Sequence, residues 1–125
     1  REQGHLVDDA GPSADVSTDY PDLAAPVADA VAAGRADFGV LVCGSGIGMS
    51  IAANKVAGIR AAVVQDADHA RLARQHNNAN VLCLGGRFNS PAEGKAIVSA
   101  WLDAEYEGGR HDRRLAKITA LEYRR

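Results

Sequence analysis

The feature that most constrains the fold of this chain is a glycine-rich turn that directly follows a short apolar run. Residues 38–42 read FGVLV, and residues 43–50 continue as CGSGIGMS. An apolar run of this length that ends in alternating glycines is typical of a buried parallel strand that turns sharply into a helix. Glycine permits the tight turn and lets backbone N–H groups approach an anion near the helix N-terminus. The pattern therefore predicts a strand–turn–helix unit.

Cys43 lies at the mouth of this turn, and the residues alone leave two interpretations of it open. The positive potential near a helix N-terminus favours a thiolate, which makes Cys43 a candidate reactive group. A buried cysteine beside a structural turn fits the segment equally well. The glycines do not decide between the two, because they match neither the dinucleotide-binding fingerprint nor the phosphate-binding loop with its lysine.

Strand-like and helix-like segments alternate along the rest of the chain. We expect strands at residues 5–8, 38–42, 58–64 and 80–84, and helices at 18–34, 48–56, 66–75, 91–105 and from about residue 111 onward. This alternation predicts a Rossmann-like, three-layer α/β/α fold with a parallel sheet, whose ligands bind at the carboxyl ends of the strands. At 125 residues we expect a single domain, residues 1–125, in which 108–125 form a basic C-terminal helix.

Apolar periodicity also predicts which helix faces are buried. In the segment 91–105, the positions expected to point inward are Ala96, Ile97, Ala100 and Trp101. In the last helix Leu115, Ile118 and Leu121 share one stripe.

Composition and charge exclude several classes of protein. No apolar run approaches the roughly 20 residues that span a bilayer, and no signal-peptide pattern opens the chain. The two cysteines, Cys43 and Cys83, both lie in apolar runs, which favours reduced thiols in the cytoplasm and a buried Cys83. No Cys/His spacing of the structural-zinc kind occurs. The basic segment 110–125 lacks interleaved aromatic residues, so we expect a solvated helix face or a small-anion site there and no nucleic-acid partner.

Two further polar clusters are candidates for function. The run HNNAN at 76–80 can orient hydroxyl groups and move protons, although an asparagine helix cap explains it as well. The run GGRHDRR at 108–114 places Arg110 and Arg114 one helical turn apart, which suits phosphate binding as well as a solvated basic face.

Taken in order, these motifs resemble the type B ribose-5-phosphate isomerases, a family that also includes the galactose-6-phosphate isomerase subunits. The resemblance covers nearly the whole chain and is carried by DYPD at 19–22, CGSGIGMSIAANK at 43–55, ARLA at 70–73, HNNANVL at 76–82, LGGR at 84–87 and EYEGGRH at 105–111. It implies an enzyme that interconverts ribose 5-phosphate and ribulose 5-phosphate, with no metal ion and no organic cofactor. The alternatives are an isomerase of a six-carbon sugar phosphate, such as galactose or allose 6-phosphate, or a non-catalytic sugar-phosphate-binding subunit.

The resemblance also implies a catalytic set. Moving a carbonyl group between C1 and C2 needs a base that carries a proton through an enediolate, and Cys43 would be that base. Met49 stands where a second branch of the family has a catalytic Glu, which places this chain in the cysteine branch. His76 would help to open the sugar ring. The enediolate oxygen would be stabilised by the Ser45 hydroxyl and by the amides of Gly44, Gly46 and Gly48.

The remaining implied roles concern substrate binding and assembly. Asn77 would hold sugar hydroxyls and Tyr20 would line the pocket, while Arg87, Arg110 and Arg114 would supply positive charge, the last two chiefly to the phosphate. Sites of the family lie between two subunits, so the resemblance implies a homodimer or a dimer of dimers, with a phosphorylated sugar as its substrate.

One departure concerns the start of the chain. The family's first strand, its Asp-His-Ala-Gly motif and its first helix do not occur in these residues, although that Asp and His contribute to ring opening and phosphate binding. Met49 is the sole methionine, and Arg1 to His5 look like the end of a helix. We therefore expect further residues to precede Arg1 in the natural chain.

Overall fold

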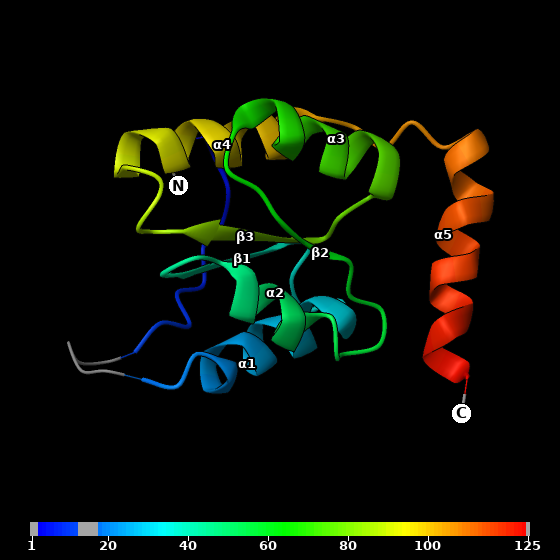
Figure 1. Cartoon of the computed structure of the whole chain (residues 1–125), viewed down its shortest axis with the longest axis horizontal. Coiled ribbons are helices and arrows are strands. Elements are labelled where there is room, and N and C mark those ends of the chain that lie inside the picture. Colours follow the sequence, from blue (N-terminus) through cyan, green and yellow to red (C-terminus); the bar gives the residue numbers. More distant parts are fainter. Residues whose placement is uncertain (1–2, 13–17, 125) are drawn as a thin grey trace.

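A three-stranded parallel sheet lies at the centre of the protein. The structure, a computed structural model, describes residues 3–12 and 18–124. The strands are β1 (Gly39–Cys43), β2 (Ala61–Val63) and β3 (Val81–Gly85), in the order β1-β3-β2. Both pairings are parallel, which confirms the predicted sheet (Figure 1). All five residues of β3 are buried, as expected for a central strand covered on both faces.

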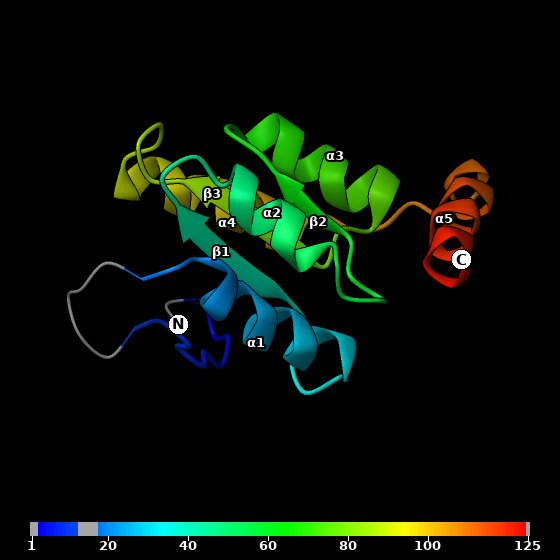
Figure 2. The same cartoon turned by 60° about the horizontal axis from the view of Figure 1, so that its bottom comes forward.

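Two pairs of helices cover the two faces of the sheet (Figures 1 and 2). On one face lie α1 (Pro21–Ala32) and α2 (Ile47–Ala53), and on the other lie α3 (Ala67–Asn77) and α4 (Pro91–Asp103). Successive side chains of a strand point to opposite faces, so β3 contributes Val81 and Cys83 to one core and Leu82 and Leu84 to the other. This arrangement confirms the predicted three layers.

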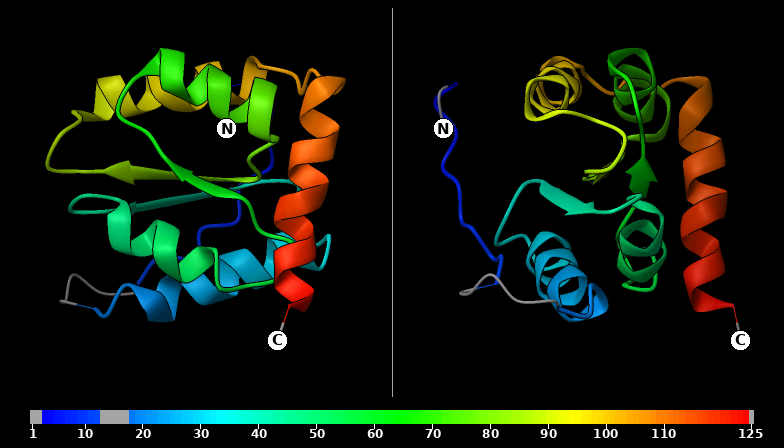
Figure 3. Two further views of the ribbon diagram at one scale, coloured as in Figure 1. Left: turned by 45° about the vertical axis from the view of Figure 1, so that its right-hand side comes forward. Right: turned by 60° about the vertical axis from the view of Figure 1, so that its left-hand side comes forward.

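Helix α5 (Arg110–Ala120), followed by the short 3₁₀ helix η1 (Leu121–Tyr123), stands beside the layers on the β2 side (Figure 3). The loop before α5 and the 3₁₀ helix after it are each hydrogen-bonded to the rest of the protein. The amide of Glu107 donates to the carbonyl of Gln75 at 3.0 Å, and the amide of Gly58 donates to Glu122 Oε1 at 2.8 Å. The helix is shorter than the predicted 108–125, because Gly108 and Gly109 both have positive φ angles and form the turn before it.

Three predictions about local structure were wrong. Residues 5–8 form no strand, because no described strand pairs with them, and the side chain of Leu6 is fully exposed. The strand predicted at 58–64 is confined to Ala61–Val63, since Gly58 turns with φ +88° and the amide of Arg60 donates to the side chain of Asn80. On α4, Ile97 and Trp101 are buried and Ala100 is partly buried, but Ala96 is exposed on the flank of the helix.

The outer edge of β2 is occupied by a side chain. The Asn54 carboxamide accepts a hydrogen bond from the Ala61 amide at 2.8 Å and donates one to the Ala61 carbonyl at 3.0 Å. Asn54 follows directly on α2, so the end of that helix is joined to the strand it precedes. Nowhere in the described part of the chain does a helix combine the length and apolar character that crossing a bilayer requires.

Candidate active site

Cys43 is the last residue of β1, at the carboxyl edge of the sheet, and it is partly buried. The amide of Gly46 points back and donates a hydrogen bond to the Cys43 sulfur at 3.1 Å. Gly46 has φ +80°, and a side-chain carbon on it would lie 2.9 Å from the carbonyl carbon of Leu84. Only glycine fits this position, because any side chain would force the turn away from β3. The turn therefore holds a thiol at the end of a strand, as the sequence predicted.

The side chains of Tyr20 and Arg87 close over this turn. An added side-chain carbon on Gly48 would overlap the Tyr20 ring, and one on Gly44 would lie 3.0 Å from Arg87 Nε. The backbone fixes Arg87 here, since its amide donates to the Gly44 carbonyl at 3.1 Å. The structure thus brings an aromatic ring and a guanidinium group to the glycine turn that carries Cys43.

The Ser45 side chain lies between the turn and a neighbouring hollow. Its hydroxyl oxygen accepts a hydrogen bond from the Ile47 amide at 3.2 Å, which leaves the hydroxyl proton available to another acceptor. The hollow has a volume of about 340 Å³ and is lined by Ser45, Ile47, Val63, Val64, Gln65, Asp66 and His69. This volume falls within the range of small-molecule sites.

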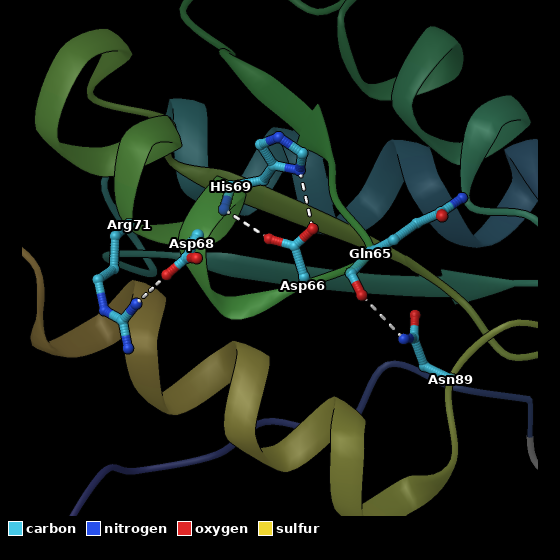
Figure 4. Close-up of polar contacts among 6 residues, drawn as sticks. All are labelled: Gln65, Asp66, Asp68, His69, Arg71 and Asn89. Carbon is cyan, nitrogen blue, oxygen red and sulfur yellow. Dashed lines mark hydrogen bonds and ion pairs between the residues drawn. The ribbon is translucent and has the colours of Figure 1, made fainter.

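Polar contacts fix the far wall of this hollow (Figure 4). Asp66 caps α3 by accepting a hydrogen bond from the His69 amide at 2.8 Å, and its other oxygen lies 3.0 Å from His69 Nδ1. The side chain of Asn89 donates to the Gln65 carbonyl at 3.0 Å, which joins the segment after β3 to the segment after β2. The wall is therefore tied to both strands whose ends it adjoins.

The other predicted site residues gather where α3 ends and α5 begins. His76 and Asn77 are the last residues of α3, and Arg110 and Arg114 are exposed on the first turns of α5. The asparagine cap that the sequence also allowed is present. The capping residue is Asn78, which has φ +46° and ends α3. His76 and Asn77 do not serve as that cap.

These two groups lie at opposite ends of the parallel strands. We call the side on which the strands end the carboxyl edge and the side on which they begin the amino edge. Cys43 pairs with Gly85 at the carboxyl end of β3, whereas His76 and Asn77 precede the start of the same strand at Val81. The strand between them spans about 13 Å at the usual rise per residue. Within one chain the predicted residues therefore form two separate groups: Tyr20, Cys43, Gly44, Ser45, Gly46, Gly48 and Arg87 at the carboxyl edge, and His76, Asn77, Arg110 and Arg114 at the amino edge.

Two residues to which the sequence assigned no role complete the amino-edge group. Glu107 Oε1 lies 3.6 Å from His76 Nε2 and 3.7 Å from His111 Nε2. The two imidazole rings are stacked, with centroids 4.4 Å apart and an angle of 18° between their planes. Burial lowers the pKa of His111, and the nearby charges of His76 and Arg110 lower it further, against the opposing effect of Glu107. The sequence signal that could have indicated the contact between Glu107 and His111 is their spacing of four residues.

Two imidazoles and a carboxylate are also a donor set that zinc accepts, and their ligand atoms all lie within 4.8 Å of one another. Zinc requires each ring nitrogen to point at the metal from about 2.1 Å. Nearly parallel rings stacked at 4.4 Å direct their in-plane lone pairs side by side, so they do not converge on one point. The arrangement favours an electrostatic role for the carboxylate over metal binding.

The fold and these two groups define a class of protein: a Rossmann-like α/β protein with a thiol on a glycine turn and a second polar group contributed by the end of α3 and the start of α5. A profile described as Ribose/Galactose Isomerase matches residues 1–118. The chain belongs to this ribose/galactose isomerase family.

Individual relatives agree with this assignment. Ribose-5-phosphate isomerase B of Escherichia coli is 53% identical over 124 residues, which are 99% of this chain and 83% of that protein. Ribose-5-phosphate isomerase B of Clostridium thermocellum has a TM-score of 0.95 and 48% identity, covering 98% of this chain and 82% of that one. The Mycoplasma genitalium enzyme, solved with bound ribulose-5-phosphate, has a TM-score of 0.87 and 49% identity, covering 92% of this chain and 77% of that one.

Proposed function

We propose that this protein interconverts ribose 5-phosphate and ribulose 5-phosphate, with Cys43 as the base. The observation that carries the proposal is the position of this thiol, held by the Gly46 amide at the carboxyl end of β1. Ligands of open parallel α/β sheets bind at this edge. Membership of the ribose/galactose isomerase family and the ribulose-5-phosphate complex of a relative support the substrate class.

In this proposal Cys43 removes the proton from C2 of the open-chain aldose and returns it to C1, while a proton moves between the two oxygens. The intermediate is an enediolate, whose oxygen accepts hydrogen bonds from the Ser45 hydroxyl and the amides of Gly44 and Gly48. The resemblance assigned the Gly46 amide to the same task, but this amide instead donates its hydrogen bond to the Cys43 sulfur. Proton transfer between neighbouring carbons of one sugar needs no redox or metal cofactor.

The amino-edge group supplies the other roles from a second copy of the chain. His76 opens the sugar ring, Asn77 holds sugar hydroxyls, and Arg110 and Arg114 bind the phosphate, while Tyr20 and Arg87 contact the sugar from the carboxyl edge.

The separation of the two groups within one chain supports a homodimer, alone or as half of a dimer of dimers. The apolar stripe that runs along α5 into η1 supports it too, since Ile118 is 45% exposed and Leu121 58% exposed in the single chain. The two free thiols favour the cytoplasm.

A coupled assay tests the activity directly. The purified full chain should convert ribose 5-phosphate to ribulose 5-phosphate, with lower kcat/KM for galactose 6-phosphate and allose 6-phosphate. A reversed preference would identify a six-carbon isomerase, which the family's description also covers. Binding of the sugar phosphates without turnover would identify a non-catalytic binding subunit.

Replacing Arg114 with alanine should weaken phosphate binding. Losing one charge-assisted hydrogen bond costs about 1.5–3 kcal/mol, or about 10- to 150-fold in affinity. Arg114→Ala should raise KM for ribose 5-phosphate by that factor, with little change in turnover of unphosphorylated ribose. Arg113→Ala removes the adjacent exposed charge from the same helix and serves as the matched control. Equal effects of the two substitutions would assign Arg114 to general surface charge.

A further inference from the structure

The cluster of His76, Glu107 and His111 joins the end of α3 to the start of α5. A single carboxylate oxygen, Glu107 Oε1, lies at ion-pair distance from the Nε2 atoms of both imidazoles, at 3.6 and 3.7 Å. The rings themselves are stacked face to face. One carboxylate and one ring therefore contact the side chain that we assign to ring opening.

The backbone and a neighbouring hydrogen bond hold Glu107 in place. Its own amide donates to the Gln75 carbonyl at 3.0 Å, which fixes residue 107 beside the last turn of α3. The preceding residue is anchored to α5, because the Tyr106 hydroxyl donates to Asp112 Oδ1 at 2.6 Å. The backbone of Glu107 is thus attached on one side to α3, which carries His76. On the other side it is attached through Tyr106 to α5, which carries His111.

The two imidazoles differ in their surroundings. The side chain of His111 is 9% exposed, whereas that of His76 is 36% exposed and so remains accessible to a ligand. Burial and the charges of His76, Arg110 and Arg114 lower the pKa of His111, so its ring favours the neutral form. A neutral, buried ring is a fixed surface on which the more exposed ring can stack without charge repulsion.

We propose that Glu107 and His111 are positioning residues for His76, with the Glu107 carboxylate directing its Nε2 atom and the His111 ring fixing its plane. The inference rests on the proposed function, in which His76 opens the furanose ring. A proton-transferring imidazole works only when the transferring nitrogen faces the proton, and a carboxylate partner also stabilises the imidazolium that forms.

The kinetic test compares Glu107→Gln with Glu105→Gln, the same substitution at an exposed position of the same loop. Glu107→Gln should lower kcat for ribose 5-phosphate by about 10- to 100-fold, at or below the usual contribution of acid–base catalysis. It should lower kcat much less for a four-carbon aldose phosphate, which cannot close into a furanose. Glu107→Asp should restore part of the loss. Equal losses on both substrates, or a loss equal to that of Glu105→Gln, would overturn the proposal.

The contribution of His111 is tested by ring replacement. His111→Phe keeps a flat ring under His76, whereas His111→Ala removes it. The phenylalanine variant should therefore retain more activity on ribose 5-phosphate than the alanine variant, with both equally active on the four-carbon substrate. Equal activity of the two variants on ribose 5-phosphate would overturn the role of stacking.

An NMR readout separates this inference from the proposed function. In Glu107→Gln the ring resonances of His76 and His111 should both move, and the pKa of His111 should fall further, because Glu107 is the group that raises it. Glu105→Gln should leave both rings unchanged. Unchanged imidazoles in Glu107→Gln would overturn the positioning role. A wild-type protein without isomerase activity would instead overturn the proposed function, with the NMR result still reporting on the cluster.

Discussion

Replacing Cys43 with serine should lower isomerase turnover by about 10²- to 10⁴-fold, the contribution that a positioned base usually makes. A hydroxyl group of similar size preserves the shape of the turn, but it is far less acidic than a thiol and removes a carbon-bound proton poorly. KM should change little, because the phosphate and sugar contacts stay in place. Steady-state kinetics on ribose 5-phosphate measure both quantities.

Cys83 offers a matched control for this prediction. It is fully buried in β3, and burial, followed by the charge of Cys43, raises its pKa to about 12. Iodoacetamide should therefore modify Cys43 first and inactivate the enzyme, with substrate giving protection, while Cys83 reacts slowly. Cys83→Ala should retain turnover. Near-normal turnover in Cys43→Ser would show that another group is the base.

Mixing two inactive variants should restore activity. If each site takes Cys43 from one chain and the arginines from its partner, a hybrid of Cys43→Ser with Arg110→Ala/Arg114→Ala contains one intact site and one doubly damaged site. With free exchange in an equal mixture, half of the dimers are hybrids, so about a quarter of the wild-type activity should return for a two-fold symmetric dimer. Activity at low ribose 5-phosphate concentration measures the recovery.

The control mixes Cys43→Ser with a Cys43→Ser/Arg114→Ala protein, which leaves no intact site in any combination and should show no recovery. Native mass spectrometry verifies that hybrid dimers form. No recovery in a sample that contains hybrids would mean that both groups act from one chain, which would contradict the shared site.

Local sequence signals predicted most of the fold and the glycine turn that carries Cys43. Glycines that follow an apolar run specify the turn at Cys43, and the cap at Asp66 follows from side-chain chemistry next to its helix. The strand predicted at residues 5–8 was wrong because a strand depends on a neighbour, and a short apolar segment carries no information about whether one is present.

The part of the site that could not be predicted depends on contacts between distant elements. Glu107 and His111 acquire their relation to His76 only because the loop before α5 meets the end of α3. Glu107 and His111 are only four residues apart, on either side of the glycine turn before α5, but no local pattern relates either one to His76. The separation of Cys43 from His76 is likewise a property of the strand between them.

The carboxamide of Asn54 has a consequence for how copies of this protein can associate. An open strand edge normally invites another chain to add its own strand, which leads to uncontrolled growth of a sheet. Here the Asn54 side chain already occupies the outward amide and carbonyl of Ala61, as a neighbouring peptide group would. Association through that edge would first have to break both bonds, so the Asn54 side chain protects the β2 edge of the sheet against strand addition by a second copy.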